Sequence, residues 1–174
     1  MTYQEEEDEE AWKPKNYEDR FYGPTSLRTG LVLSRNVVTI KILKKIGIGY
    51  TLNYLKRFGF GDDLPRDLSL ALGSGSVSPY DLARAYAGFA TYGRRFEPEI
   101  VQFINQENVG PIYTVRGNQV LEGRPQAAEE RIISEQTAYI TTNMLADVVQ
   151  NGTGWRVRAL KRPMAGKTGT SDDN

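Results

Sequence analysis

The sequence contains no cysteine and no histidine among its 174 residues. The absence of cysteine excludes disulfides, thiolate zinc sites and thiol nucleophiles. The absence of histidine excludes a Ser-His-Asp triad, imidazole-ligated metals and any imidazole base. Acid–base chemistry in this chain must therefore use lysine, carboxylate or tyrosine side chains, and we expect neither a metal nor a cofactor.

Long apolar runs and an excess of charge are also missing. Lysine plus arginine number 22, aspartate plus glutamate number 22, and the formal net charge is zero. A balanced chain gives no reason to expect nucleic acid as a partner. The apolar runs are far too short to span a bilayer, so we expect no membrane segment and a soluble chain. A hydrophobic content of 39% is nevertheless enough for a folded core.

Acidic residues are concentrated at the N-terminus, where Glu5 to Glu10 are six consecutive acids. Blocks of like charge are typically solvated and poorly ordered. We therefore predict an acidic, flexible segment over residues 1–16 and a folded unit over residues 17–174.

Apolar periodicity and capping residues predict a series of helices. The first begins at Thr25-Ser26 and ends near Ser34. Three more are expected over residues 36–46, 50–58 and 78–92, with Gly47, Gly59 and Gly93 as their ends, and the last runs from Ser134 to Val149. Two short helices that meet at Ser34-Arg35-Asn36 would place those three side chains at a bend.

Strand patterns are fewer. Residues 99–106 and 111–116 read as two strands joined by Asn108-Val109-Gly110, which predicts a hairpin. Pro163 to Thr170 reads as a short extended strand. Tyr80, Tyr86 and Tyr139 lie at helical spacing, and we expect them to pack in the core rather than to act as acids or bases.

Lys167-Thr168-Gly169-Thr170 is the most conspicuous polar motif. A cation, two hydroxyls and a glycine on one short strand form an edge suited to an anionic ligand, although an ordinary edge strand is the simpler interpretation. A phosphate-binding loop would need glycine at position 161, where the chain has Lys161. The nucleotide-binding alternative is therefore disfavoured.

Several further stretches, taken in order, resemble the transpeptidase domain of class A (bifunctional, 1A-type) penicillin-binding proteins. Ser-x-Asn followed by Lys-Thr-Gly is part of the signature of these proteins, and here it is Ser34-Arg35-Asn36 and Lys167-Thr168-Gly169. The other matching stretches are Trp12-Lys13-Pro14 with Asn16-Tyr17, Ser26-Leu27-Arg28, residues 68–74, residues 81–86, Gly152-Thr153-Gly154 and residues 165–170.

The resemblance implies a helix-rich α/β fold, namely a partial penicillin-binding/β-lactamase-like transpeptidase fold made of the helical subdomain plus the active-site strand. It implies catalytic roles for Ser34, Asn36 and Lys167. Ser34 would relay a proton to the leaving amine, Asn36 would bind the acyl side-chain amide, and Lys167 would face the substrate carboxylate. Thr168, Gly169, Thr170, Thr153 and Gly154 would line the substrate-binding edge, with the backbone N–H of Thr170 as half of an oxyanion hole.

The nucleophile of that family lies in a Ser-x-x-Lys motif, and no serine in this chain has lysine three residues later. The resemblance implies that the nucleophile precedes the Trp12 region in a longer parent protein. We therefore expect a piece of a D,D-transpeptidase that cross-links peptidoglycan, inactive by itself. The alternative is a non-catalytic scaffold or binding module of the same fold.

The resemblance also implies partners and location. Peptidoglycan stem peptides and β-lactams would bind the parent, which would be anchored in the bacterial cytoplasmic membrane with this domain facing the periplasm or cell exterior. An unpaired edge on the strand at Pro163 to Thr170 would allow a homodimer.

Overall fold

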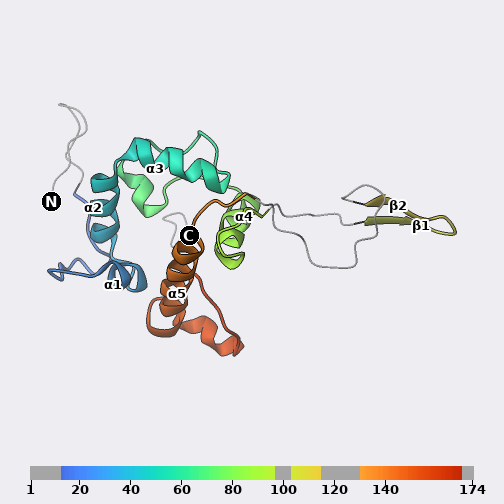
Figure 1. The fold of residues 1–174 in the computed structure, drawn as a ribbon. Coiled ribbons are helices and arrows are strands. Elements are labelled where there is room, and N and C mark those ends of the chain that lie inside the picture. The colour runs from blue at the N-terminus through green and yellow to red at the C-terminus, as the bar shows by residue number, and fades with distance from the viewer. Residues whose placement is uncertain (1–12, 97–102, 115–129, 170–174) are drawn as a thin grey trace.

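The computed structural model describes residues 13–96, 103–114 and 130–169. They form a helical body from which a two-stranded hairpin extends (Figure 1). The elements are α1 (Leu27–Val32), α2 (Asn36–Ile46), α3 (Ile48–Leu55), η1 (Lys56–Phe58), η2 (Leu68–Leu72), α4 (Pro79–Ala90), β1 (Phe103–Gln106), β2 (Gly110–Thr114), α5 (Glu135–Asn151) and η3 (Trp155–Leu160), where η marks a 3-10 helix. Within these residues no helix is both long enough and apolar enough to cross a bilayer.

Serine begins three of the helices. The side chains of Ser26, Ser78 and Ser134 each accept a hydrogen bond from the backbone N–H three residues on. Such a bond satisfies one of the donors that a helix leaves free at its first turn. Ser78 also donates to Asp81 Oδ2 at 2.6 Å. The expected starts of α1, α4 and α5 are confirmed.

The junction between α2 and α3 differs from the expectation in detail. Gly47 ends α2 with φ 92° and ψ 139°, which is not the left-handed helical conformation with which glycine commonly ends a helix. The extended ψ lets α3 begin directly at Ile48, two residues earlier than predicted. Gly59 does adopt the left-handed conformation after η1, with φ 87° and ψ 12°.

The hairpin is confirmed within the described residues. β1 and β2 pair antiparallel with Phe103 opposite Thr114, and an irregularity falls between Ile104 and Asn105. Asn108 has φ 63°, as a tight turn requires. The outer parts of the predicted strands, residues 99–102 and 115–116, lie outside the described residues.

Two apolar clusters form the core of the described part. One contains Phe58, Ala85, Ile132, Ile133 and Ala138, and the other contains Ile40, Leu43 and Leu68. In α5, Ala138 and Val148 are both 0% exposed. Burying a side chain of the size of valine or isoleucine contributes about 1.5–3 kcal/mol, so α5 is anchored along its length. Ala138, Leu145 and Val148 are all buried, so they lie on the face of α5 that meets the core.

Two expectations are corrected. Residues 163–169 belong to no sheet within the described part of the chain, and Gly166 N–H instead donates to Leu145 O of α5 at 3.2 Å. The three tyrosines are not core residues, because Tyr80, Tyr86 and Tyr139 are 40%, 38% and 64% exposed. Tyr139 follows the fully buried Ala138, so the next position along the helix turns away from the core.

Candidate active site

The bend between α1 and α2 carries the first predicted site residue. Arg35 N–H donates to Gly30 O at 2.8 Å, and Ser34 N–H donates to Leu31 O at 3.2 Å. This pair of bonds is the Schellman pattern that ends a helix, and it requires a left-handed residue between the helix and the second donor. Ser34 is that residue, with φ 52°.

Glycine is the usual occupant of such a position because it has no Cβ to collide with the backbone. A serine held there costs on the order of 1–3 kcal/mol. Residues in sparsely populated backbone conformations cluster at functional sites. The bend itself does not need the hydroxyl of Ser34, so the presence of serine at this position indicates a functional role.

Lys167 meets Ser34 across the fold. Lys167 Nζ donates to Ser34 Oγ at 2.8 Å, although 133 residues separate the two. The same amine donates to Thr168 O at 2.8 Å. Sequence order placed these motifs in one family signature, and the fold places their side chains in hydrogen-bond contact.

Thr153 extends this line of polar groups. Thr153 Oγ1 and Thr168 Oγ1 lie 2.7 Å apart, and either hydroxyl can donate. Both threonines are exposed, so their hydroxyls are accessible to a ligand. The contacts run from Ser34 through the Lys167 amine and Thr168 to Thr153, and this set of four residues is called the polar row below.

The loop before Thr153 is tied to the end of α1. Thr153 N–H donates to Val32 O at 3.3 Å, which satisfies a carbonyl at the C-terminus of α1. A Cβ at Gly152 would collide with that same carbonyl oxygen. Glycine at position 152 therefore permits the close approach that brings Thr153 to the Ser34 bend.

The remaining predicted residues divide into three groups. Asn36 begins α2, and its Nδ2 donates to Lys15 O at 3.2 Å rather than to the polar row. Gly154 is buried beside α5, and Gly169 is exposed at the end of the described chain. Thr170 lies outside the described residues.

The electrostatics of Lys167 suit an anionic ligand. Its side chain is half-buried, and this burial lowers the pKa of the Lys167 amine from the ordinary value of 10.5. Within the described residues Lys167 forms no ion pair, and its neighbours are hydroxyls and a carbonyl. A carboxylate entering the site would thus meet a cation without an existing carboxylate partner.

A phosphate loop is not formed by Gly166-Lys167-Thr168. Position 161 is Lys161, and residues 163–169 are irregular, with no helix following Lys167 in the described chain. Phosphate loops need both a glycine-rich turn and a helix N-terminus. The geometry gives no support to nucleotide binding.

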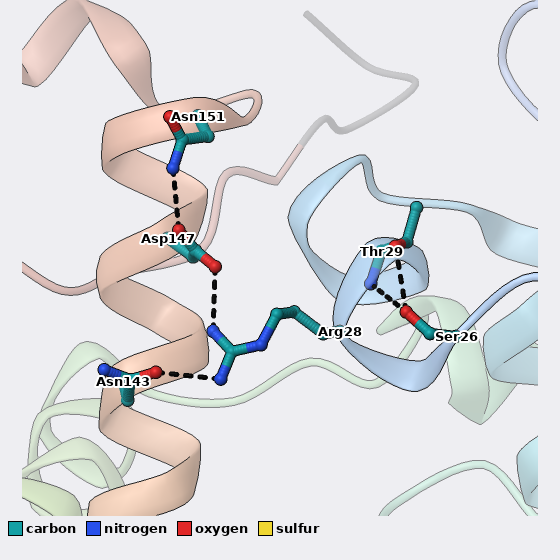
Figure 2. A network of polar contacts seen from close by, with 6 residues as sticks. All are labelled: Ser26, Arg28, Thr29, Asn143, Asp147 and Asn151. Atoms are coloured by element: carbon teal, nitrogen blue, oxygen red, sulfur yellow. Dashed lines mark hydrogen bonds and ion pairs between the residues drawn. The ribbon is translucent and has the colours of Figure 1, made fainter.

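Arg28 makes a contact between α1 and α5 that sequence reasoning missed. Arg28 Nη1 donates to Asp147 Oδ2 and Arg28 Nη2 to Asn143 Oδ1, both at 2.8 Å (Figure 2). Asn151 Nδ2 donates to the other oxygen of Asp147 at 2.8 Å. These bonds hold the pKa of the Asp147 carboxyl below its usual range, with the Arg28 bond the largest cause and the Asn151 bond the next.

This network sets α1 against the helix that also binds the Lys167 segment. The sequence contained a signal for it, because Asn143, Asp147 and Asn151 follow at four-residue spacing and therefore share one helix face. A polar stripe of that kind commonly faces solvent, so the spacing alone did not identify Arg28 as its partner.

A comparison with protein-family models identifies the family of this chain. The family model described as "Penicillin binding protein transpeptidase domain" matches residues 1–173. The chain therefore belongs to the penicillin-binding protein transpeptidase domain family, and its fold is a helix-rich part of that domain.

Relatives within the family are penicillin-binding proteins 1A. The chain is 35% identical to the protein of Pseudomonas aeruginosa over 208 residues, which is 95% of this chain and 25% of that protein. It is 37% identical to the Vibrio cholerae protein, over 94% of this chain and 23% of that one. It is 39% identical to the Neisseria gonorrhoeae protein, over 94% of this chain and 20% of that one. The chain thus spans about a fifth to a quarter of the length of these relatives.

Solved structures support the same fold. The crystal structure of penicillin-binding protein 1A from Haemophilus influenzae superposes with a TM-score of 0.85 and 28% identity, covering 99% of this chain and 30% of that one. The D,D-transpeptidase domain of a peptidoglycan glycosyltransferase from Eggerthella lenta superposes with a TM-score of 0.71 and 21% identity, over 91% and 45%. The latter likeness concerns the fold alone.

Proposed function

We propose that this chain supplies the substrate-facing amine and hydroxyl groups of a D,D-transpeptidase that cross-links peptidoglycan by serine acyl transfer. The observation that carries the proposal is the 2.8 Å contact between Lys167 Nζ and Ser34 Oγ. A relay hydroxyl and a carboxylate-binding cation must lie near each other if both act on one small substrate, and this contact meets that requirement.

The reaction has two acyl-transfer steps. A serine outside these 174 residues attacks the carbonyl between the two terminal D-alanines of a stem peptide. A bond forms between the serine oxygen and the acyl carbon, and the peptide C–N bond breaks. The departing D-alanine amine takes a proton, and an amine of a second stem peptide then attacks the acyl-enzyme and restores the serine.

The polar row supports specific roles in this scheme. Ser34 Oγ passes a proton to the leaving amine, and Lys167 Nζ is the donor within reach of that oxygen. The charged form of Lys167 pairs with the terminal carboxylate of the stem peptide or with the carboxylate of a β-lactam. Thr168 and Thr153 offer hydroxyls beside that carboxylate, and Asn36 binds the amide of the acyl side chain.

The same proposal covers the longer protein. The longer protein carries the Ser-x-x-Lys nucleophile, a glycosyltransferase unit and a membrane anchor, and it holds this domain outside the cytoplasmic membrane. The partial domain, expected over residues 17–174, also includes Lys15 and Asn16, because Asn16 is buried and accepts from Val37 N–H of α2, and Asn36 donates to Lys15 O. The 174-residue chain alone does not form an acyl-enzyme, because it has no nucleophile of the required pattern.

A fluorescent penicillin tests both statements on a denaturing gel. We expect no covalent band on the 174-residue chain, and a band on the full-length protein that cold penicillin competes away. A Ser34→Ala change in the full-length protein should slow the labelling by about 100-fold or more, as expected for loss of a general acid–base group. A band on the isolated chain would contradict the proposed division of the site, and normal labelling of the Ser34→Ala protein would contradict the relay.

A further inference from the structure

Asn16 is the buried polar side chain of the described part of the chain, with 7% exposure. Its Oδ1 accepts a hydrogen bond from Val37 N–H at 3.2 Å, and its Nδ2 donates to Arg20 O at 2.6 Å. An N–H partner and a carbonyl partner together fix which way the amide faces. Asn16 is therefore held at both ends.

The bond to Val37 caps α2 from a distance. Val37 is in the first turn of α2, and the residue before that helix, Arg35, makes no capping bond with its side chain. The N–H groups of a first helical turn need an outside acceptor. Asn16, 21 residues earlier in the chain, supplies it.

Two further residues of the Ser34 bend are held by the same segment. Arg35 Nη1 lies 2.8 Å from Glu18 Oε2, and its guanidinium lies 3.5 Å from the centre of the Tyr22 ring. The Arg35 side chain is only 12% exposed. Asn36 Nδ2 donates to Lys15 O at 3.2 Å. Residues 15–22 thus contact three consecutive residues, Arg35, Asn36 and Val37, each through at least one side chain, and we call this segment the clasp.

We propose that the clasp positions Asn36 for the substrate, with Asn16 as its central positioning residue and Arg35 as the side chain that closes it. The inference rests on the proposed function, since it takes Asn36 as the group that meets the acyl side chain. The bond to Lys15 O occupies one N–H of the Asn36 amide. Within the described residues, the carbonyl oxygen and the second N–H of that amide have no further partner, so they can meet a ligand amide in the direction that the clasp sets.

The role of Arg35 follows from its partners. Glu18 balances its charge and Tyr22 covers its face, so Arg35 acts on the bend rather than on a substrate carboxylate. The middle residue of the Ser-x-Asn motif is then a structural link to the clasp. Ser34 on one side of Arg35 contacts Lys167, and Asn36 on the other side contacts the clasp.

The test compares two β-lactams on the full-length protein. Benzylpenicillin carries the acyl side-chain amide, and the unsubstituted penam carboxylate lacks it. The variants are Asn16→Ala, Asn16→Asp, Asn36→Ala and, as a matched control, Asn53→Ala at an exposed position in α3. The measured quantity is the second-order acylation rate per titrated active site, so molecules that fail to fold are not counted.

Asn16→Ala should lower the rate with benzylpenicillin by about tenfold, because an oriented contact is lost, and should change the rate with the unsubstituted penam much less. Asn16→Asp keeps the acceptor for Val37 N–H but sets a carboxylate oxygen against Arg20 O, so it should restore only part of the rate with benzylpenicillin. In the Asn36→Ala background, Asn16→Ala should add little further loss, since the two changes remove the same contact. Asn53→Ala should leave both rates unchanged.

The outcomes are separable. If Asn36→Ala discriminates between the β-lactams and Asn16→Ala does not, the clasp is wrong and the proposed function stands. If Asn16→Ala slows both β-lactams equally, Asn16 is only structural and the clasp is again wrong. If Asn36→Ala itself leaves both rates at the wild-type value, the role of Asn36 in the proposed function fails and the clasp fails with it.

Discussion

The backbone N–H of Arg35 donates to the carbonyl of Gly30 at 2.8 Å, and this bond closes α1 around a left-handed Ser34. A glycine would fulfil the backbone requirement at lower cost. The backbone conformation at residue 34 favours glycine, whereas the proposed proton relay needs the serine hydroxyl. Substitutions at this position can therefore separate stability from activity.

Ser34→Gly should remove activity without loss of stability. The change relieves the left-handed strain, and this gain offsets the loss that comes from the greater entropy of the unfolded chain, so the free energy of unfolding should stay equal or rise by up to about 1 kcal/mol. Acylation of the full-length protein should fall by about 100-fold or more. Chemical denaturation and penicillin labelling measure the two effects. Ser34→Ala is the control, because it removes the hydroxyl but keeps the Cβ, and a less stable Ser34→Gly protein would contradict the strain argument.

Lys167 should impose an alkaline limit on acylation. Burial lowers the pKa of its amine below 10.5, so the cation that faces the substrate carboxylate is lost as pH rises through that lowered value. The rate should therefore fall at a lower pH than an exposed lysine would dictate. A pH profile of the acylation rate measures this limit.

The matched variant for that profile is Lys167→Arg, which stays charged over the whole range. We expect a slower enzyme whose alkaline limit moves to higher pH or disappears. If the alkaline limit of the Lys167→Arg protein is unchanged, the titration of another group causes that limit. The same lowered pKa means that the folded state binds this proton less tightly than the unfolded state does, so the Lys167 contribution to the free energy of unfolding should increase as pH rises toward 10.5.

Gly152→Ala should loosen the contact between α1 and the Thr153 loop. The new Cβ would collide with Val32 O and would lie 2.8 Å from Val32 Cγ1. We expect a loss of about 1–3 kcal/mol in the free energy of unfolding, as for other overpacked sites, together with slower acylation. Gly49→Ala is the control, because no atom beyond the adjacent backbone of α3 lies within 4 Å of its added Cβ and alanine favours a helix by up to about 1 kcal/mol. Equal stability of the two variants would contradict the close approach at Gly152.

The self-association expected from the edge at Pro163 to Thr170 stays a prediction. Residues 163–169 pair with no strand in the described part of the chain, so backbone groups other than Gly166 N–H and Thr168 O could pair with a second copy. Light scattering of the purified chain at increasing concentration should show a dimer mass that grows. A constant monomer mass would contradict pairing through this segment.

The helices were predictable because their signals are local. A serine caps each of three helices through a bond to the N–H only three residues on, at Ser26, Ser78 and Ser134. The buried face of α5 likewise follows from the spacing of its own apolar residues. The tyrosines were not predictable in this way. Whether Tyr139 is covered depends on which elements pack beside α5, and spacing within one helix does not contain that information.

The candidate site was predictable in part. The family signature named Ser34 and Lys167, but only the fold shows that Lys167 Nζ reaches Ser34 Oγ. Contacts such as Arg28 with Asp147 and Asn16 with Val37 join segments far apart in the chain. Such bonds have no local pattern, since either partner alone looks like an ordinary polar residue.

Helix α5 acts as a spacer whose length in residues matters as much as its composition. Leu145 O accepts from Gly166 N–H, and Asp147 accepts from Arg28. Just past the C-terminal end of the helix, Thr153 N–H donates to Val32 O. Removing one residue between Leu145 and Gly152 would rotate everything beyond it by about 100° and shorten the helix by about 1.5 Å. Such a deletion would separate Ser34 from Lys167 without touching either, so substitutions on the exposed face of this helix should be far better tolerated than any change in its length.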